Sequence, residues 1–188
     1  MYLIISGTNR PDSRTLEVAK IMERLYIKKK QPVEILDLNT IGLENLNSSH
    51  YGETKKPESI QQAIEKVNSA EGLVVVCPEY NGSMPGALKL FIDHWAYPLS
   101  FEHRAVSFVG LGGRWGGLRP VEHLQQVFGY RNSFQYPDRV FITNVWDVLK
   151  NGTIKDKTIN TLLESQVDGF IRFTAGLKSQ KLLAQCRD

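Results

Sequence analysis

The residues with the clearest chemical meaning lie between an apolar run, Gly72–Val76, and an apolar-periodic segment that begins near Gly86. The apolar run predicts a buried strand and the periodic segment predicts a helix. The turn between them is built from residues that set special backbone geometry, and it contains Pro78, Glu79, Tyr80, Asn81, Gly82 and Ser83. Ligands of open parallel α/β sheets bind beyond the carboxyl ends of strands. A polar turn with a central aromatic residue therefore suits a flat ring that needs backbone hydrogen bonds on its edges.

A second turn is typical of an anion site. It joins a predicted first strand, Tyr2–Ser6, to a predicted helix over about Leu16–Lys29. Its candidate donors are hydroxyls, arginines and the free N–H groups of a helix start, and its side chains include Thr8, Arg10, Ser13, Arg14 and Thr15. A capped turn, with Ser13 or Thr15 as N-cap and the arginines in solvent, is the alternative. The ring-binding turn downstream favours phosphate.

Gly112-Gly113-Arg114-Trp115-Gly116-Gly117 forms a third candidate segment, after the predicted strand Ala105–Leu111. Gly110-Leu111-Gly112 begins like a dinucleotide fingerprint, but Trp115 occupies the third glycine position. A Rossmann site is therefore not supported. Ser83 follows a strand as a hydrolase nucleophile would, but its neighbours lack the Gly-x-Ser-x-Gly spacing, which makes a serine hydrolase a poor fit.

Together these segments resemble the NAD(P)H-dependent FMN reductases of the flavodoxin-like superfamily, which include quinone, azo-dye and chromate reductases. The loop from Gly7 to Ser13 is similar to the family's Gly-Ser-x-Arg-x-x-Ser pattern, with Thr8 in place of the serine. Pro78 to Lys89 match Pro-Glu-Tyr-Asn-x-Ser-x-Pro-Gly-x-Leu-Lys at every fixed position. His94 then separates Asp93 from Trp95, where the family has Asp-Trp. The resemblance covers roughly residues 1–145.

The resemblance implies specific roles for these residues. FMN would place its phosphate on Thr8, Arg10, Ser13 and Thr15. Its ring would lie against Pro78, Glu79, Tyr80, Asn81, Gly82 and Ser83. The pyrimidine side would be covered by Gly112, Gly113, Arg114, Trp115 and Gly116. NAD(P)H, with NADPH favoured, would reduce the flavin, which would then reduce a quinone, azo compound, metal oxyanion or flavin in a ping-pong scheme. No catalytic side chain and no metal ligand is predicted.

Two alternatives belong to other functional classes. One is an FMN-binding electron carrier or redox sensor without nicotinamide turnover, although flavodoxins proper are acidic and carry a different phosphate loop. The other is an interaction module without flavin, since a fold alone does not fix a function. The complete phosphate loop argues against the second.

The elements that position these turns alternate as strands and helices. Further strands are expected at Val33–Leu38, Leu73–Cys77 and Arg139–Thr143, and further helices at Gly86–Tyr97, about Pro120–Phe128 and about Lys157–Ala175. This alternation predicts one α/β domain over residues 1–188, with a flavodoxin-like three-layer sandwich around a five-stranded parallel sheet. The expected strand order is 2-1-3-4-5, which places the ligand between strands 1 and 3.

Composition restricts the remaining possibilities. The 188 residues are 41% hydrophobic and 23% charged with a net charge of +3, which is typical of a globular chain and too weakly basic to indicate nucleic-acid binding. No stretch is apolar enough for a membrane span or a signal peptide. Cys77 and Cys186 are far apart, and the four histidines lack metal-ligand spacing. A reducing, cytoplasmic location is therefore expected.

Two segments are open to more than one interpretation. The long loop 39–56 leaves the predicted ligand side of the sheet, so that His50 or Tyr51 could cover a substrate, but a plain solvent loop is an equal alternative. The segment Gly86–Tyr97 has more apolar residues than one buried stripe requires. The family resemblance implies a homodimer or homotetramer, and a leftover apolar face on this segment would suit a subunit contact, with a fully buried helix as the alternative.

Overall fold

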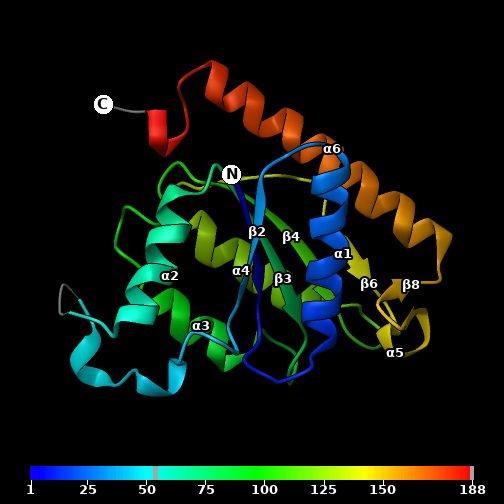
Figure 1. Ribbon diagram of the computed structural model, residues 1–188, viewed down its shortest axis with the longest axis horizontal. Helices are drawn as coiled ribbons and strands as arrows, with labels where there is room; N and C mark the ends of the chain where they lie inside the picture. Colours follow the sequence, from blue (N-terminus) through cyan, green and yellow to red (C-terminus); the bar gives the residue numbers. More distant parts are fainter. Residues whose placement is uncertain (53–54, 187–188) are drawn as a thin grey trace.

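The structure, a computed structural model, describes residues 1–52 and 55–186. A parallel sheet forms its centre, with the order β2-β1-β3-β4-β5, and helices cover both faces (Figure 1). The flavodoxin-like fold and the strand order 2-1-3-4-5 are therefore confirmed. The carboxyl ends of the strands meet at the lower edge in Figure 1, called the carboxyl edge below; the opposite edge is the amino edge.

The four long strands are β1 (Tyr2–Ser6), β2 (Val33–Asp37), β3 (Gly72–Pro78) and β4 (Ala105–Leu111). Every residue of β1, β3 and β4 is buried, whereas β2 lies at the edge and is mostly half-buried. Helices on both faces explain why the inner strands are continuous apolar runs rather than alternating ones.

Two short strands occupy the fifth position of the sheet. β5 (Phe134–Gln135) pairs with the start of β4 and β6 (Val140–Ile142) pairs with its end. The expected strand at Arg139–Thr143 corresponds to β6, whereas β5 was not expected. Pro137 lies between them and has no N–H to donate. The buried Gln166 amide fills this gap by donating to the carbonyls of Phe108 and Asp138, both at 2.9 Å.

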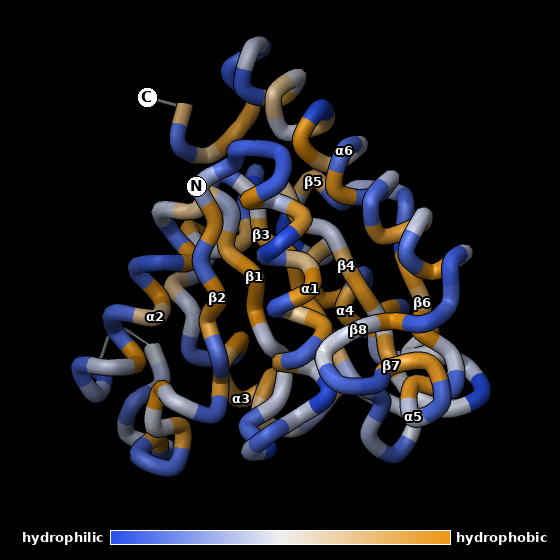
Figure 2. Tube along the Cα trace, turned by 45° about the vertical axis from the view of Figure 1, so that its right-hand side comes forward, coloured by the Kyte–Doolittle hydropathy of each residue, from blue (hydrophilic) through white to orange (hydrophobic). Residues whose placement is uncertain are grey.

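The helices form the two outer layers. α1 (Arg14–Lys28) and α6 (Lys157–Ser179) pack on the face that receives Tyr2 and Ile4, while Leu3 and Ile5 point to the other face. That second face is covered by α2 (Glu58–Ser69), α3 (Gly86–Asp93) and α4 (Leu118–Gly129). Figure 2 shows hydrophobic residues along the strands and hydrophilic ones in the loops below them.

The expected helix Gly86–Tyr97 is shorter than predicted, because α3 ends at Asp93 with His94 as its C-cap. The chain turns soon afterwards at Pro98, and the residue before a proline avoids helical geometry. Cys77 lies in β3, directly before Pro78 and the turn that joins β3 to α3. Its side chain is completely buried in the same core as α3.

The loop 39–56 contains two 3₁₀ turns, η1 (Leu43–Asn45) and η2 (Ser48–His50). His50 accepts a hydrogen bond on Nδ1 from the N–H of Asn47 at 3.1 Å, and Tyr51 stacks on His94 with ring centroids 4.3 Å apart. Both side chains predicted to cover a substrate thus contact the protein itself. Residues 53–54 of this loop lie outside the described residues.

A short insertion follows β6 and lies beside the lower end of α1 (Figures 1 and 2). It consists of the helical turn α5 (Val145–Val148) and the antiparallel hairpin of β7 (Leu149–Lys150) and β8 (Thr153–Ile154). The last element of the described residues is η3 (Ala184–Cys186).

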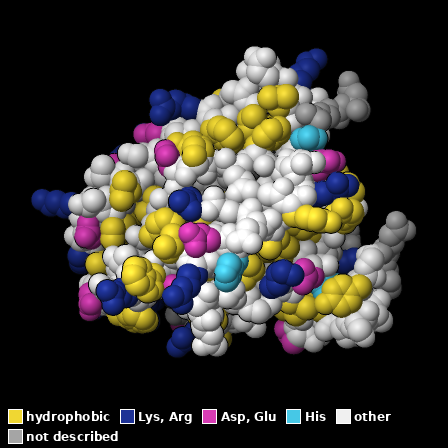
Figure 3. All heavy atoms as spheres, turned by 180° about the vertical axis from the view of Figure 1, so that it is seen from behind, with side chains coloured by type: hydrophobic (Ala, Val, Ile, Leu, Met, Phe, Trp, Pro, Cys, Tyr) yellow, Lys and Arg dark blue, Asp and Glu magenta, His cyan; other side chains and the backbone are white. Residues whose placement is uncertain are grey.

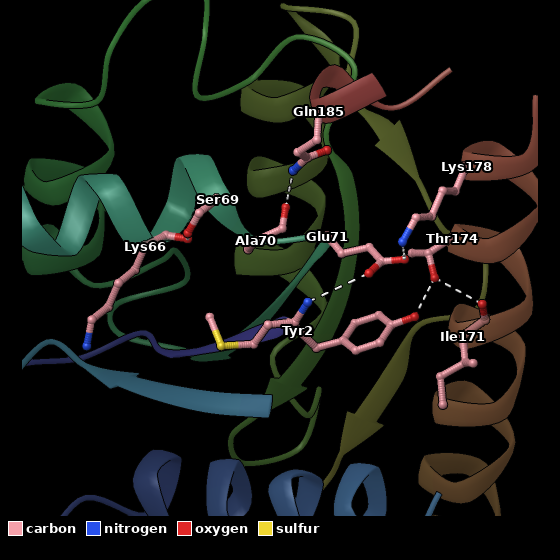
Figure 4. A network of polar contacts seen from close by, with 10 residues as sticks. Tyr2, Lys66, Ser69, Ala70, Glu71, Ile171, Thr174, Lys178 and Gln185 are labelled. Atoms are coloured by element: carbon pink, nitrogen blue, oxygen red, sulfur yellow. Dashed lines mark hydrogen bonds and ion pairs between the residues drawn. The ribbon is translucent and has the colours of Figure 1, made fainter. Parts of the chain in front are cut away.

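The amino edge of the sheet is closed by a polar network between the chain start, β3 and the last elements (Figure 4). The hydroxyls of Tyr2 and Thr174 form a buried hydrogen bond. Glu71 pairs with the terminal ammonium of Met1 at 3.7 Å and with Lys178 at 3.2 Å. These contacts join β1, the start of β3 and α6.

Candidate functional site

A cavity of about 320 Å³ opens at the carboxyl edge, between the loops that follow β1, β3, β4 and β6. The loops bring together residues from four distant parts of the chain, as expected where strands end at one edge of a parallel sheet. The lining residues are Arg10, Pro11, Asp12, Ser13, Arg14, Thr15, Pro78, Glu79, Tyr80, Leu111, Gly112, Gly113, Val145 and Trp146.

The start of α1 forms one wall of the cavity. Ser13 is the N-cap, and its hydroxyl accepts a hydrogen bond from the N–H of Leu16 at 3.1 Å. The first N–H groups of a helix have no partner within the helix, so those of Arg14 and Thr15 are available to a ligand. The exposed Arg10 and Arg14 add positive charge to the positive end of the helix dipole. The wall has the donors and charge of a phosphate site.

Thr8 lies beneath this wall rather than on its surface. Its side chain is completely buried, and its hydroxyl is hydrogen-bonded to the Tyr80 hydroxyl at 3.1 Å. It also accepts from the N–H of Arg10 at 3.3 Å. Thr8 therefore ties the phosphate-type loop to the turn after β3, although it does not line the cavity itself.

The turn after β3 is a two-residue hairpin. Tyr80 and Ser83 exchange backbone hydrogen bonds at 2.9 and 3.0 Å. Asn81 and Gly82 both have positive φ angles, 51° and 76°, which is the geometry of a type I′ turn and explains the Asn-Gly pair. The Ser83 hydroxyl lies 2.8 Å from Nδ1 of His123, on α4. The tip of the turn thus points to α4, and only its first residues reach the cavity.

The glycine-rich segment after β4 packs tightly on its own strand. Gly117 has a φ of 82°, and a Cβ there would lie 2.5 Å from the backbone nitrogen of Leu111. A Cβ at Gly110 would lie 2.7 Å from the carbonyl oxygen of Gly116. This close packing brings Gly112 and Gly113 to the cavity. Arg114 and Trp115 instead contact each other, with the guanidinium 5.0 Å from the indole centre.

The structure thus separates the predicted site residues into two groups. The residues that line the cavity are Arg10, Ser13, Thr15, Pro78, Glu79, Tyr80, Gly112 and Gly113. The residues outside its lining are Thr8, Asn81, Gly82, Ser83, Arg114, Trp115 and Gly116. The residues outside the lining lie mainly in two places where the chain turns away from the cavity, the type I′ hairpin and the packed glycines.

Val145 and Trp146 line the cavity but were not predicted from the sequence. They follow shortly after the predicted strand Arg139–Thr143, and residues that follow a strand of a parallel sheet lie at the edge where ligands bind. This position was the sequence feature that could have identified them. Arg14, a candidate donor of the anion site, also lines the cavity, together with Pro11, Asp12 and Leu111. Asp12 has a φ of 49°, a conformation that aspartate tolerates and that lets the loop turn into α1.

Residues 1–52 and 55–186 contain neither a metal-ion cluster nor a membrane-spanning helix. No group of three or more His, Cys, Asp or Glu side chains is placed to hold a metal ion. Within the same residues, no helix has the length and apolar character that crossing a membrane requires.

The fold and the cavity define the chain as a flavodoxin-like protein with a phosphate-type loop at the sheet's switch point between β1 and β3. Residues 2–147 match the family described as NADPH-dependent FMN reductase. The chain belongs to this family. Its class is therefore that of the NAD(P)H-dependent flavoprotein oxidoreductases, with FMN as cofactor and NAD(P)H as substrate.

Individual relatives agree with this assignment. The FMN-dependent NADPH-azoreductase of Staphylococcus aureus (strain USA300) is 31% identical over 132 residues, which span 66% of this chain and 67% of the relative. The flavoenzyme NAD(P)H:(acceptor) oxidoreductase FerB of Paracoccus denitrificans has a TM-score of 0.70 at 19% identity, with 93% and 96% of the two chains covered. An azoreductase of Bacillus anthracis str. Sterne has a TM-score of 0.61 at 14% identity, with 92% and 99% covered. The two solved structures support the fold.

Proposed function

We propose that the chain binds FMN in the carboxyl-edge cavity and uses it to reduce a small acceptor such as a quinone, an azo compound, a metal oxyanion or a free flavin. The observation that carries this proposal is the continuity of one cavity from the start of α1 to the turn after β3. We take the whole chain to act as one domain.

The chemistry of the lining residues fits FMN. Hydroxyls, helix N–H groups and two arginines at one wall suit a phosphate dianion. The other walls are formed by Pro78, Tyr80, the glycine backbone and Trp146, which suit a flat, partly apolar ring. Glycine at 112 leaves room for the Glu79 side chain, because a Cβ there would lie 3.3 Å from the Cβ of Glu79.

Each wall has a defined task. Arg10, Ser13 and Thr15 hold the phosphate. The turn from Pro78 orients the ring, and the hydrogen bond from the N–H of Glu79 to the carbonyl of Leu111, at 3.0 Å, fixes this turn against β4. When bound, FMN supplies hydride acceptance from NAD(P)H and two-electron transfer to the acceptor. The side chains bind and orient, and none is assigned as a general acid or base.

Two arginines outside the cavity are candidates for the 2′-phosphate of NADPH. Arg119 packs its guanidinium near Gly82, and Arg114 lies on Trp115; both are exposed. Replacing either with alanine should raise the Michaelis constant for NADPH and leave that for NADH nearly unchanged. An equal rise for both nucleotides would show that these arginines do not read the 2′-phosphate.

A visible absorption spectrum of the purified protein with FMN, followed anaerobically after addition of NADPH, tests the central proposal. The expected result is a protein-bound flavin spectrum that bleaches within seconds. Bleaching by dithionite but not by NADPH or NADH would favour the electron carrier or redox sensor. No FMN binding would contradict the assigned cofactor site.

We also propose that the chain forms a homodimer or homotetramer. An apolar cavity of about 420 Å³ between α3 and α4 is bordered by exposed Tyr97 and Tyr130, and Arg131 lies 4.7 Å from the Tyr97 ring. Figure 3 shows hydrophobic side chains among charged ones on the rear face. Light scattering of the native protein and of Y130E should show an oligomer that the added charge weakens; a monomeric native protein would contradict this proposal.

A further inference from the structure

One exposed tryptophan, Trp115, belongs to the glycine-rich segment and another, Trp146, packs against it, and the two have different surroundings. Trp115 is 51% exposed and Trp146 is 53% exposed. Trp115 lies outside the cavity lining and is paired with Arg114, whereas Trp146 forms part of the cavity wall. A large aromatic side chain that is left half-exposed at a ligand cavity has apolar area still to bury.

The inner side of Trp146 is fixed by the glycine-rich segment. The N–H groups of Asn144 and Val145 donate to the carbonyls of Gly113 and Gly112, at 2.8 and 2.9 Å. A Cβ at Gly113 would lie 3.2 Å from Cζ3 of Trp146, so the absent side chain lets the indole approach the backbone closely. Indole and glycine backbone therefore form one continuous wall.

The helical turn α5, which carries Trp146, continues directly into the hairpin of β7 and β8. The Asn-Gly turn of this hairpin is of type I′, with φ angles of 50° at Asn151 and 66° at Gly152. Two side chains of α1 hold this turn: Glu17 accepts a hydrogen bond from the N–H of Gly152 at 3.0 Å, and Arg24 donates one to the carbonyl of Gly152 at 2.8 Å. The hairpin thus connects α5 to the helix whose start forms the phosphate-type wall.

From this arrangement we infer that Trp146 is a flavin-contacting residue, and that segment 144–154 is a bracket that positions it against the ring. The inference rests on the proposed FMN site and extends it. The residues matched by the family end at 147, so most of the bracket lies beyond them. Trp146 is the binding residue and Glu17 is a positioning residue that acts through the bracket.

Dissociation constants for FMN and for riboflavin, measured by flavin fluorescence on the wild type, W146A, W146F and W115A, test the inference. W146A should weaken both ligands by roughly tenfold, since aromatic stacking on a ring is of that order. W146F should recover most of the affinity. W115A is the matched control, with a tryptophan of equal exposure removed outside the cavity, and it should bind like the wild type.

The two ligands separate ring contact from phosphate contact. Riboflavin has no phosphate, so R10A should weaken FMN binding and leave riboflavin unchanged, whereas W146A should weaken both equally. If the wild type binds FMN and W146A binds it as tightly as W115A does, the inference is wrong and the proposed function stands. If the wild type binds no FMN, the proposed function itself fails.

A double-mutant cycle tests the positioning role of Glu17. E17A should weaken FMN binding by a few-fold in the wild type and have no effect in W146A, because it acts only through the indole. Equal effects in both backgrounds would show that the bracket does not position Trp146. Thermal unfolding of each variant separates these effects from a loss of fold.

Discussion

The two edges of the sheet are built in opposite ways. At the amino edge, polar groups have partners: the hydroxyls of Tyr2 and Thr174 are hydrogen-bonded and Gln185 donates to the carbonyl of Ala70 (Figure 4). Arg104 likewise donates to the carbonyl of Asn68. At the carboxyl edge, the helix start at Arg14 directs its first N–H groups into a cavity. The contrast separates stability from binding. The paired groups of the amino edge stabilise the fold, whereas the donors of the carboxyl edge are available to a ligand.

Truncation of the core behind the amino edge should have the largest effect. Phe170 is completely buried, and its ring centroid lies 5.9 Å from that of Tyr2 and 5.7 Å from that of Tyr136. F170A should lower the free energy of unfolding by about 3–5 kcal/mol because it leaves a cavity. The affinity of the folded fraction for FMN should not change. If folded F170A, at urea concentrations below its unfolding transition, also binds FMN more weakly, then stability and binding are not separated between the two edges.

Removal of a charge at the carboxyl edge should do the reverse. R10A should weaken FMN binding by about 1.5–3 kcal/mol, the range of hydrogen bonds to charged groups. Its free energy of unfolding without FMN should stay within about 0.5 kcal/mol, because the side chain is exposed. R139A removes the same charge from a site outside the cavity lining and serves as the control. Calorimetry that shows equal binding by both variants would contradict the assignment of the phosphate loop.

Alkaline pH should act on the buried tyrosines of the α1 and α6 face. Burial raises the pKa of Tyr26 well above its ordinary value, with a smaller contribution from Tyr2, whose own pKa is also raised by burial. The unfolded chain then loses these protons first, so the contribution of the two tyrosines to stability is constant below about pH 10 and falls above it. Y26F should remove about 1.4 kcal/mol per pH unit of that fall. An unchanged slope in denaturant titrations at pH 9–11 would show that Tyr26 is not responsible.

Thiol labelling should show the smallest difference between the edges. Cys186 is half-exposed at the end of the described chain, whereas Cys77 is completely buried directly before the turn of the cavity. A disulfide reagent at pH 8 should therefore label one thiol per native chain and two after unfolding. Rapid labelling of both thiols in the native protein would indicate that the carboxyl edge opens more easily than its packing implies.

Much of the fold could be predicted because the signals were local and agreed with one another. Strands β1, β3 and β4 are continuous apolar runs between helical segments, and this pattern alone indicates a covered parallel sheet. The divided fifth position was harder. β5 has only two residues, and its separation from β6 depends on Gln166, which comes from a distant helix.

The site was predictable where a loop continues directly from its strand. Glu79 lines the cavity for this reason, whereas Ser83 is turned toward His123 by two residues with positive φ. Ser13 lines the cavity from the other end of its loop, as the N-cap of α1. The sequence could not distinguish the tryptophan that lines the cavity, because Trp115 and Trp146 both follow predicted strands. In the structure the two are also about equally exposed. Their difference is set by two backbone hydrogen bonds, from Asn144 to Gly113 and from Val145 to Gly112.

The burial of Cys77 affects how the protein responds to oxidants. Burial raises the pKa of its thiol far above the ordinary value, so the thiolate that reacts with oxidants is almost absent at neutral pH. The first step on the path to sulfenic and sulfinic acids is thereby suppressed at the residue just before the cavity. Oxidants should therefore modify the half-exposed Cys186 and leave Cys77 reduced, so that the start of the cavity turn stays chemically unchanged.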